Sequence, residues 1–89
     1  MKPTDEEIKE ERRKIRYLRM LVDLTRNILY QGDLSYQEAL QLIASTKNAA
    51  LKLFPDKEET YNLIYRPRFE RILWEVYGRT ESDKILEEE

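Results

Sequence analysis

Three helix-start signals divide this 89-residue chain into three segments. In each signal, a short oxygen-bearing side chain precedes a Glu by three positions: Thr4 and Glu7, Ser35 and Glu38, Asp56 and Glu59. The first side chain can accept a hydrogen bond from a free N–H at the start of a helix, and the Glu can accept one from the capping residue. Apolar residues with helical spacing follow each signal. The chain is therefore predicted to form three helices joined by short turns.

The first two helices have clear predicted limits. The first runs from Asp5 to Gln31, because Gly32 can take the left-handed conformation that commonly ends a helix. The second runs from Tyr36 to Leu53, because the residue before Pro55 is disfavoured in a helical conformation.

The third helix is predicted to start near Lys57 with Asp56 as its cap and to end before Gly78. Pro67 interrupts it, because proline lacks an N–H and clashes with the carbonyl four residues earlier. The prediction is a helix that is kinked or split at Pro67. The fold class is all-α, a three-helix antiparallel bundle.

The length of the chain corresponds to one domain. Residues 1–78 are predicted to form this single helical domain. Residues 79–89 are polar and acidic, and they are predicted to be a frayed C-terminal tail.

The first helix carries two adjacent apolar stripes, whereas a surface helix of a small protein needs one. The first stripe contains Ile8, Ile15, Leu18, Val22, Thr25 and Leu29. The second contains Tyr17, Leu21, Leu24 and Ile28, with Met20 beside it. Two stripes indicate that this helix either lies between its neighbours or faces a partner.

Composition restricts the chemistry that the chain can perform. It has no cysteine and no histidine, so disulfides, thiolate zinc sites and the commonest general base near neutral pH are absent. No metal, cofactor or small-molecule substrate is evident, and an enzyme is not expected. Charged residues make up 38% of the chain, yet the net charge is −2, so nucleic acid is not a favoured partner. Neither a signal peptide nor a long apolar stretch is evident, so we expect a cytoplasmic protein without membrane contact.

The segment from Tyr65 to Trp74 is the most distinctive local stretch, because it combines aromatic residues with Arg66, Arg68 and Arg71. Aromatic and arginine side chains are common anchors of protein interfaces. The alternative is that these arginines are solvated or paired with acidic residues of the first helix, with Phe69 buried. The predicted protein-binding residues are Leu18, Val22, Tyr65, Arg68 and Trp74.

The leading functional hypothesis is a non-enzymatic protein–protein interaction module, in one version a homodimer formed through the first helix. An engineered scaffold with an aromatic contact face is the first alternative, because high charge with few amides and no cysteine suits a designed chain as well as a thermophilic one. A weak nucleic-acid binder that uses the Arg66–Arg71 region is the second. No local motif is specific to a known activity.

Overall fold

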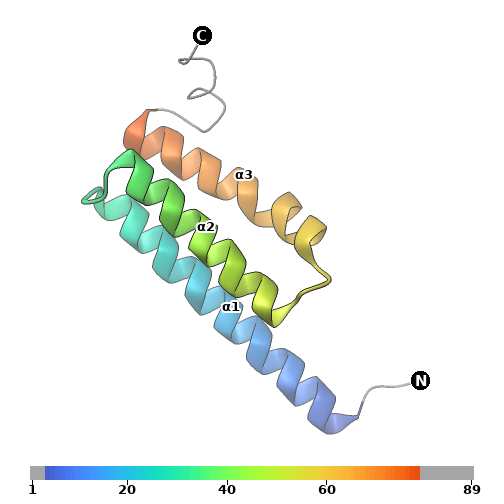
Figure 1. Cartoon of the computed structure of the whole chain (residues 1–89). Helices are drawn as coiled ribbons and strands as arrows, with labels where there is room; N and C mark the ends of the chain where they lie inside the picture. The colour runs from blue at the N-terminus through green and yellow to red at the C-terminus, as the bar shows by residue number, and fades with distance from the viewer. Residues whose placement is uncertain (1–3, 79–89) are drawn as a thin grey trace.

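The computed structural model describes residues 4–78 and contains three α-helices packed against one another (Figure 1). α1 spans Asp5–Gln31, α2 spans Tyr36–Leu53 and α3 spans Glu58–Tyr77. Each helix contacts both of the others, so the all-α helical bundle predicted from the sequence is confirmed. The predicted tail of residues 79–89 lies outside the described residues.

Reciprocal capping boxes start α1 and α2, as predicted. At α1, the Glu7 N–H donates to Thr4 Oγ1 at 3.2 Å and the Thr4 N–H donates to Glu7 Oε2 at 3.3 Å. At α2, Ser35 and Glu38 make the same pair of bonds at 3.1 and 3.0 Å. Each box satisfies two backbone donors that the helix itself leaves unpaired, so local sequence fixes these two starts.

The predicted start of α3 is wrong in its cap. Asp56 does not cap the helix: Lys57 is the N-cap residue, and its side chain makes no capping bond. The Lys57 N–H donates to the Phe54 carbonyl at 3.1 Å, so Asp56 lies in the turn between the helices. The first helical residue, Glu58, instead forms an ion pair with Lys47 of α2 at 3.2 Å. A tertiary contact therefore accompanies the start of α3 in place of a local cap.

Two glycines end α1 and α3 in the left-handed conformation. Gly32 has φ 73° and donates to the Leu29 carbonyl, and Gly78 has φ 71° and donates to the Trp74 carbonyl. Residues with a Cβ are disfavoured at such φ values, which explains why glycine occupies both positions.

α3 runs as one helix from Glu58 to Tyr77. It continues through Pro67 and is not divided into two segments.

The core lies where the three helices meet. Its buried apolar residues are Val22, Leu29, Tyr36, Ala39, Ala50, Tyr61, Phe69, Ile72 and Leu73. Burial of a large apolar side chain contributes about 1.5–3 kcal/mol, so this cluster supplies the main driving force for packing. On α1 it is the first stripe that enters this core, through Val22 and Leu29.

Two tyrosine hydroxyls connect the ends of the helices. Tyr77 of α3 donates to the Leu34 carbonyl at 2.8 Å, and Tyr30 of α1 donates to Glu75 Oε2 of α3 at 2.8 Å. These bonds bring the C-terminal ends of α1 and α3 to the turn before α2. At the opposite end, the first turns of α1 project beyond the connection between α2 and α3 (Figure 1).

Candidate functional site

Two predicted binding residues lie on the side of α1 that faces the other helices. Val22 is buried in the core, and Leu18 is half-buried and packed against it. Both belong to the first apolar stripe, whose side chains the bundle itself uses. A partner that approaches the folded protein therefore meets other residues of α1.

The second stripe leaves an exposed apolar surface on α1. Tyr17, Met20 and Leu24 are 49%, 60% and 56% exposed, and their spacing of three and four residues places them on one side of the helix. We call these three residues the outward α1 face. Leu21 and Ile28 lie beside it and are half-buried. The sequence placed these residues in one stripe without indicating that the folded chain leaves them uncovered.

Among the predicted residues of α3, Tyr65 and Arg68 lie together. The Arg68 guanidinium carbon is 5.7 Å from the centroid of the Tyr65 ring, within the range of a cation–π contact. Tyr65 also packs against the buried Tyr61, and the centroids of their rings are 5.0 Å apart. Trp74 lies further along α3 and is 57% exposed, so its ring is available at the surface.

The other two arginines of this segment form ion pairs within α3. Arg66 Nε lies 3.2 Å from Glu70 Oε1, and Arg71 Nε lies 3.3 Å from Glu75 Oε1. The predicted alternative of pairs with acidic residues of the first helix is not found for these two arginines, because both partners lie four residues later in α3. Phe69 is buried, as that alternative required.

Leu18 and Tyr65 both line a cavity of about 360 Å³ between α1 and α3, where the last turn of α2 forms part of the wall. Ile15 and Ile64 also line it, so its walls are largely apolar. None of the other predicted binding residues lines this cavity. The structure thus gathers two of the five predicted residues in one depression and leaves Val22, Arg68 and Trp74 outside it.

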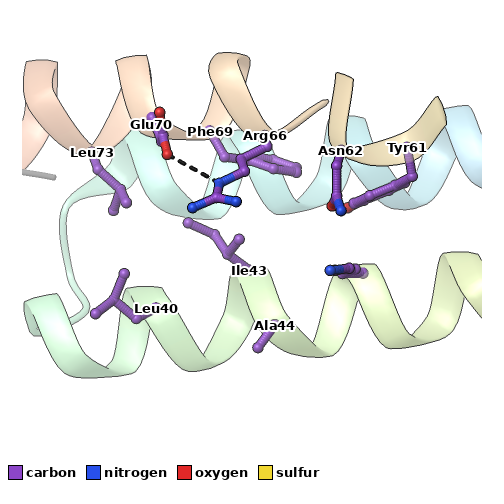
Figure 2. A pocket seen from close by; sticks show the side chains of 10 residues that line it. Leu40, Ile43, Ala44, Tyr61, Asn62, Arg66, Phe69, Glu70 and Leu73 are labelled. Carbon is purple, nitrogen blue, oxygen red and sulfur yellow. Dashed lines mark hydrogen bonds and ion pairs between the residues drawn. The ribbon is translucent and has the colours of Figure 1, made fainter. Parts of the chain in front are cut away.

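A second cavity, of about 270 Å³, lies between α2 and α3 (Figure 2). We call it the α2–α3 cavity; its lining residues are Leu40, Ile43, Ala44, Lys47, Tyr61, Asn62, Arg66, Phe69, Glu70 and Leu73. Half of these side chains are apolar, and the others can donate or accept hydrogen bonds. Of the polar lining residues, only Arg66 belongs to a binding segment predicted from the sequence. The others come from two helices and form no local motif that could be recognised.

Tyr61 is the most perturbed titratable group among the described residues. Burial, together with a smaller effect of the nearby Tyr65, raises the pKa of its hydroxyl from 10.0 to about 12. This hydroxyl is buried and makes no hydrogen bond within residues 4–78. A buried hydroxyl without a partner costs about 1–3 kcal/mol, so Tyr61 is unusual in an otherwise well-paired bundle.

Residues 4–78 contain neither a helix that could span a membrane nor a cluster of metal ligands. No helix among them is long and apolar enough to cross a lipid bilayer. No group of three or more of their acidic side chains is placed to hold a metal ion. No family model, curated protein or solved structure matches the chain.

Proposed function

We propose that this protein is a non-enzymatic interaction module and that the outward α1 face associates with a second copy of the chain. The observation that carries this proposal is the exposure of Tyr17, Met20 and Leu24 at successive turns of one helix. Contiguous apolar surface of this kind is characteristic of association sites. Tyr17 and Met20 also belong to residue types that are enriched in interfaces.

A second copy is the partner that this surface fits most simply. In a two-fold symmetric dimer the same face lies on both partners, so apolar side chains of one copy meet those of the other. The low net charge of −2 gives little long-range repulsion between two copies. The three residues of the face carry no charge, so their own contacts bury no ion.

The test is the mass in solution by light scattering over a range of concentrations. The wild type is expected to form a dimer that dissociates on dilution, and Leu24→Asp is expected to be monomeric because it places a charge in the apolar contact. Leu63→Asp is the matched control: Leu63 is an exposed leucine on α3, so its replacement makes the same chemical change elsewhere. Circular dichroism checks that both variants remain helical.

Two results would contradict the proposal. One is a wild type that stays monomeric at the highest concentration tested. The other is a Leu24→Asp variant that remains folded and dimeric. Substitution of Leu18 or Val22 by Asp is a poor test, because both residues pack in the core and the variants would unfold.

Trp74 supports an aromatic contact surface as a second mode of binding, as the scaffold alternative requires. Trp74 is 57% exposed on α3. Weak nucleic-acid binding has less support, because the chain has a net charge of −2, whereas nucleic-acid-binding domains usually carry a net positive charge. If the chain does bind nucleic acid, the affinity is expected to fall steeply as the salt concentration rises. Cytoplasmic location remains part of the proposal.

The proposed arrangement of the helices is antiparallel between successive helices, with a kink at Pro67. Short connections after Gln31 and Leu53 favour reversal of the chain direction. The bond from Tyr77 to Leu34 and the ion pair from Glu58 to Lys47 fit this order, since the end of α3 lies near the start of α2. Pro67 favours a kink because its ring crowds the carbonyl of Leu63.

A further inference from the structure

The α2–α3 cavity has an apolar interior and a polar edge. Ile43 of α2 and Phe69 of α3 contribute to the apolar part, and Lys47, Asn62 and Arg66 provide donors at the edge (Figure 2). Small-molecule sites in proteins have this character: mostly apolar walls with a few polar groups that orient the ligand. This cavity does not include any residue of the outward α1 face, so it is a separate surface.

Arg66 is positioned to receive an anion. Its Nε donates to Glu70 at 3.2 Å, and Figure 2 shows the rest of the guanidinium group extending over Ile43 on the facing helix. Within residues 4–78 its two terminal nitrogens make no hydrogen bond or ion pair. A guanidinium can hold a carboxylate through two parallel hydrogen bonds. A ligand carboxylate can therefore bind Arg66 while the contact to Glu70 is retained.

Lys47 adds a second positive charge on the opposite wall. Its Nζ is 3.2 Å from Glu58 Oε1, and the Glu58 side chain is 60% exposed. Exposed ion pairs of this kind contribute little free energy, so Lys47 can exchange this partner for a ligand carboxylate at small cost. The charged lining residues are Lys47, Arg66 and Glu70, which together carry one net positive charge. This balance favours an anionic ligand over a cationic one.

The Tyr61 hydroxyl supplies an unused donor beside these groups. It is buried and without a hydrogen-bond partner among the described residues, and in Figure 2 its end lies toward the end of Asn62. Tyr61 also lines the cavity between α1 and α3. Because there is space on both sides of its ring, a small movement of Tyr61 or Asn62 can bring the hydroxyl to a ligand oxygen. Such a contact removes the cost of the unpaired hydroxyl.

We propose that the α2–α3 cavity binds a small amphiphilic carboxylate, with its apolar body against Ile43 and Phe69 and its carboxylate at Arg66 and Lys47. The size of the cavity limits the ligand. Its volume of about 270 Å³ corresponds to roughly nine times the volume of a liquid water molecule. A chain as short as that of hexanoate fits this space, whereas a long-chain fatty acid exceeds it.

The experiment is a titration of the isotopically labelled full-length chain with hexanoate, followed by NMR at constant ionic strength. We expect saturable shifts at the amides of cavity-lining residues, with a Kd of about 1 mM, as suits a ligand of this size. The neutral analogue 1-hexanol has the same apolar chain, and its affinity is expected to be at least about tenfold lower because it lacks the charge-assisted bonds. Equal affinities for the two compounds, or no saturable shift at these residues, would overturn the proposal.

Two arginines provide a matched pair of variants. Arg66→Gln is expected to weaken hexanoate binding about tenfold or more. Arg71→Gln is the control, because Arg71 makes the same Nε contact with a glutamate four residues later but does not line the cavity. If both variants weaken binding equally, the carboxylate is not held at Arg66 and the proposal fails.

A third variant tests the cavity itself. Ala44 is exposed and lines the cavity, so Ala44→Leu is expected to fill the space and abolish binding while the fold is retained. Binding that persists in a folded Ala44→Leu variant would place the ligand elsewhere and refute the assignment.

Discussion

The hydroxyl oxygens of Thr25 on α1 and Thr46 on α2 lie 2.7 Å apart in the core of the bundle. Both side chains are 2% exposed. Each hydroxyl also lies within hydrogen-bond distance of a carbonyl of its own helix, that of Leu21 at 2.9 Å for Thr25 and that of Leu42 at 2.8 Å for Thr46. Because each hydroxyl has one hydrogen, one of them donates across the interface and the other donates to its own helix. This pair fixes how the two helices align in an otherwise apolar contact.

A double-mutant cycle measures this coupling. Thr25→Val and Thr46→Val are each expected to lower the free energy of unfolding by about 1 kcal/mol, since each removes one partner of a buried bond. The double variant is expected to lose less than the sum, by at least about 0.5 kcal/mol, because either single substitution already removes the bond between the two hydroxyls. Urea unfolding of the four proteins gives the values. Strict additivity would show that the two hydroxyls do not interact.

Truncation of Ile72 is expected to lower the free energy of unfolding by about 2–5 kcal/mol. Ile72 is 3% exposed, so Ile72→Ala removes contacts and leaves a cavity. Leu63→Ala is the control on the same helix, because Leu63 is 73% exposed. Its effect is expected to stay within about 0.5 kcal/mol, as for other surface substitutions. Similar losses in the two variants, measured by thermal or urea unfolding, would place Ile72 outside the core.

The capping box of α2 is expected to make stability depend on acid. The hydrogen bond from the Ser35 N–H to the Glu38 carboxylate, with a further contribution from the Ser35 side chain, lowers the pKa of Glu38 below its ordinary value of 4.5. Because the folded-state pKa is the lower one, this stabilisation is complete above pH 4.5 and is lost as the pH falls through the folded-state pKa.

The variant Glu38→Gln tests this dependence. It keeps an acceptor for the cap but does not titrate, so wild type should exceed it in stability at neutral pH. The difference should shrink as the pH falls below 4.5. Urea unfolding at a series of pH values provides the comparison. A difference that does not change with pH would show that Glu38 is not stabilised as a carboxylate.

Tyr61 is expected to contribute to the loss of stability in alkali. Burial raises its pKa from 10.0 to about 12, so the folded state holds the neutral phenol more strongly than the unfolded state does. The stability that comes from this preference for the neutral phenol is therefore complete below pH 10.0, and it declines as the pH rises to about 12. Tyr61→Phe removes this titration.

Tyr61→Phe is accordingly expected to lose less stability than wild type over this pH range. At neutral pH the variant is expected to be at least as stable as wild type, because it removes a buried hydroxyl that has no partner. Circular dichroism as a function of pH and urea measures both effects. A variant that is clearly destabilised at neutral pH would show that the hydroxyl has a stabilising partner.

Replacement of Pro67 tests the proposed kink in α3. Pro67→Ala restores an N–H that can donate to the carbonyl of Leu63, and it removes the clash of the proline ring. We expect α3 to straighten and the free energy of unfolding to rise, by at most about 3 kcal/mol. Residual dipolar couplings of the α3 amides, measured by NMR, report whether the helix axis straightens. Urea unfolding reports the free energy of unfolding. An unchanged helix axis would show that Pro67 introduces no kink.

The helices themselves were predictable because their signals are local. The capping pairs at Thr4 and Ser35 gave the observed starts of α1 and α2, and Gly32 and Pro55 gave their ends. Such signals act over a few residues, so they can be recognised without knowledge of any tertiary contact. Asp56 resembled these caps, yet the turn that ends with the Lys57–Phe54 hydrogen bond places it outside the helix start.

The surfaces of the protein were decided only by the tertiary structure. Periodicity placed Leu18 and Leu24 in two neighbouring stripes, but only the packing of α2 and α3 shows that Leu18 joins the core while Leu24 stays exposed. Lys47 and Arg66 are distant in sequence, and only the contact between α2 and α3 brings them to one cavity. Short-range hydrogen bonds thus determined the helices from sequence alone. Burial and cavity formation depend on how three helices share a limited core, which no single segment encodes.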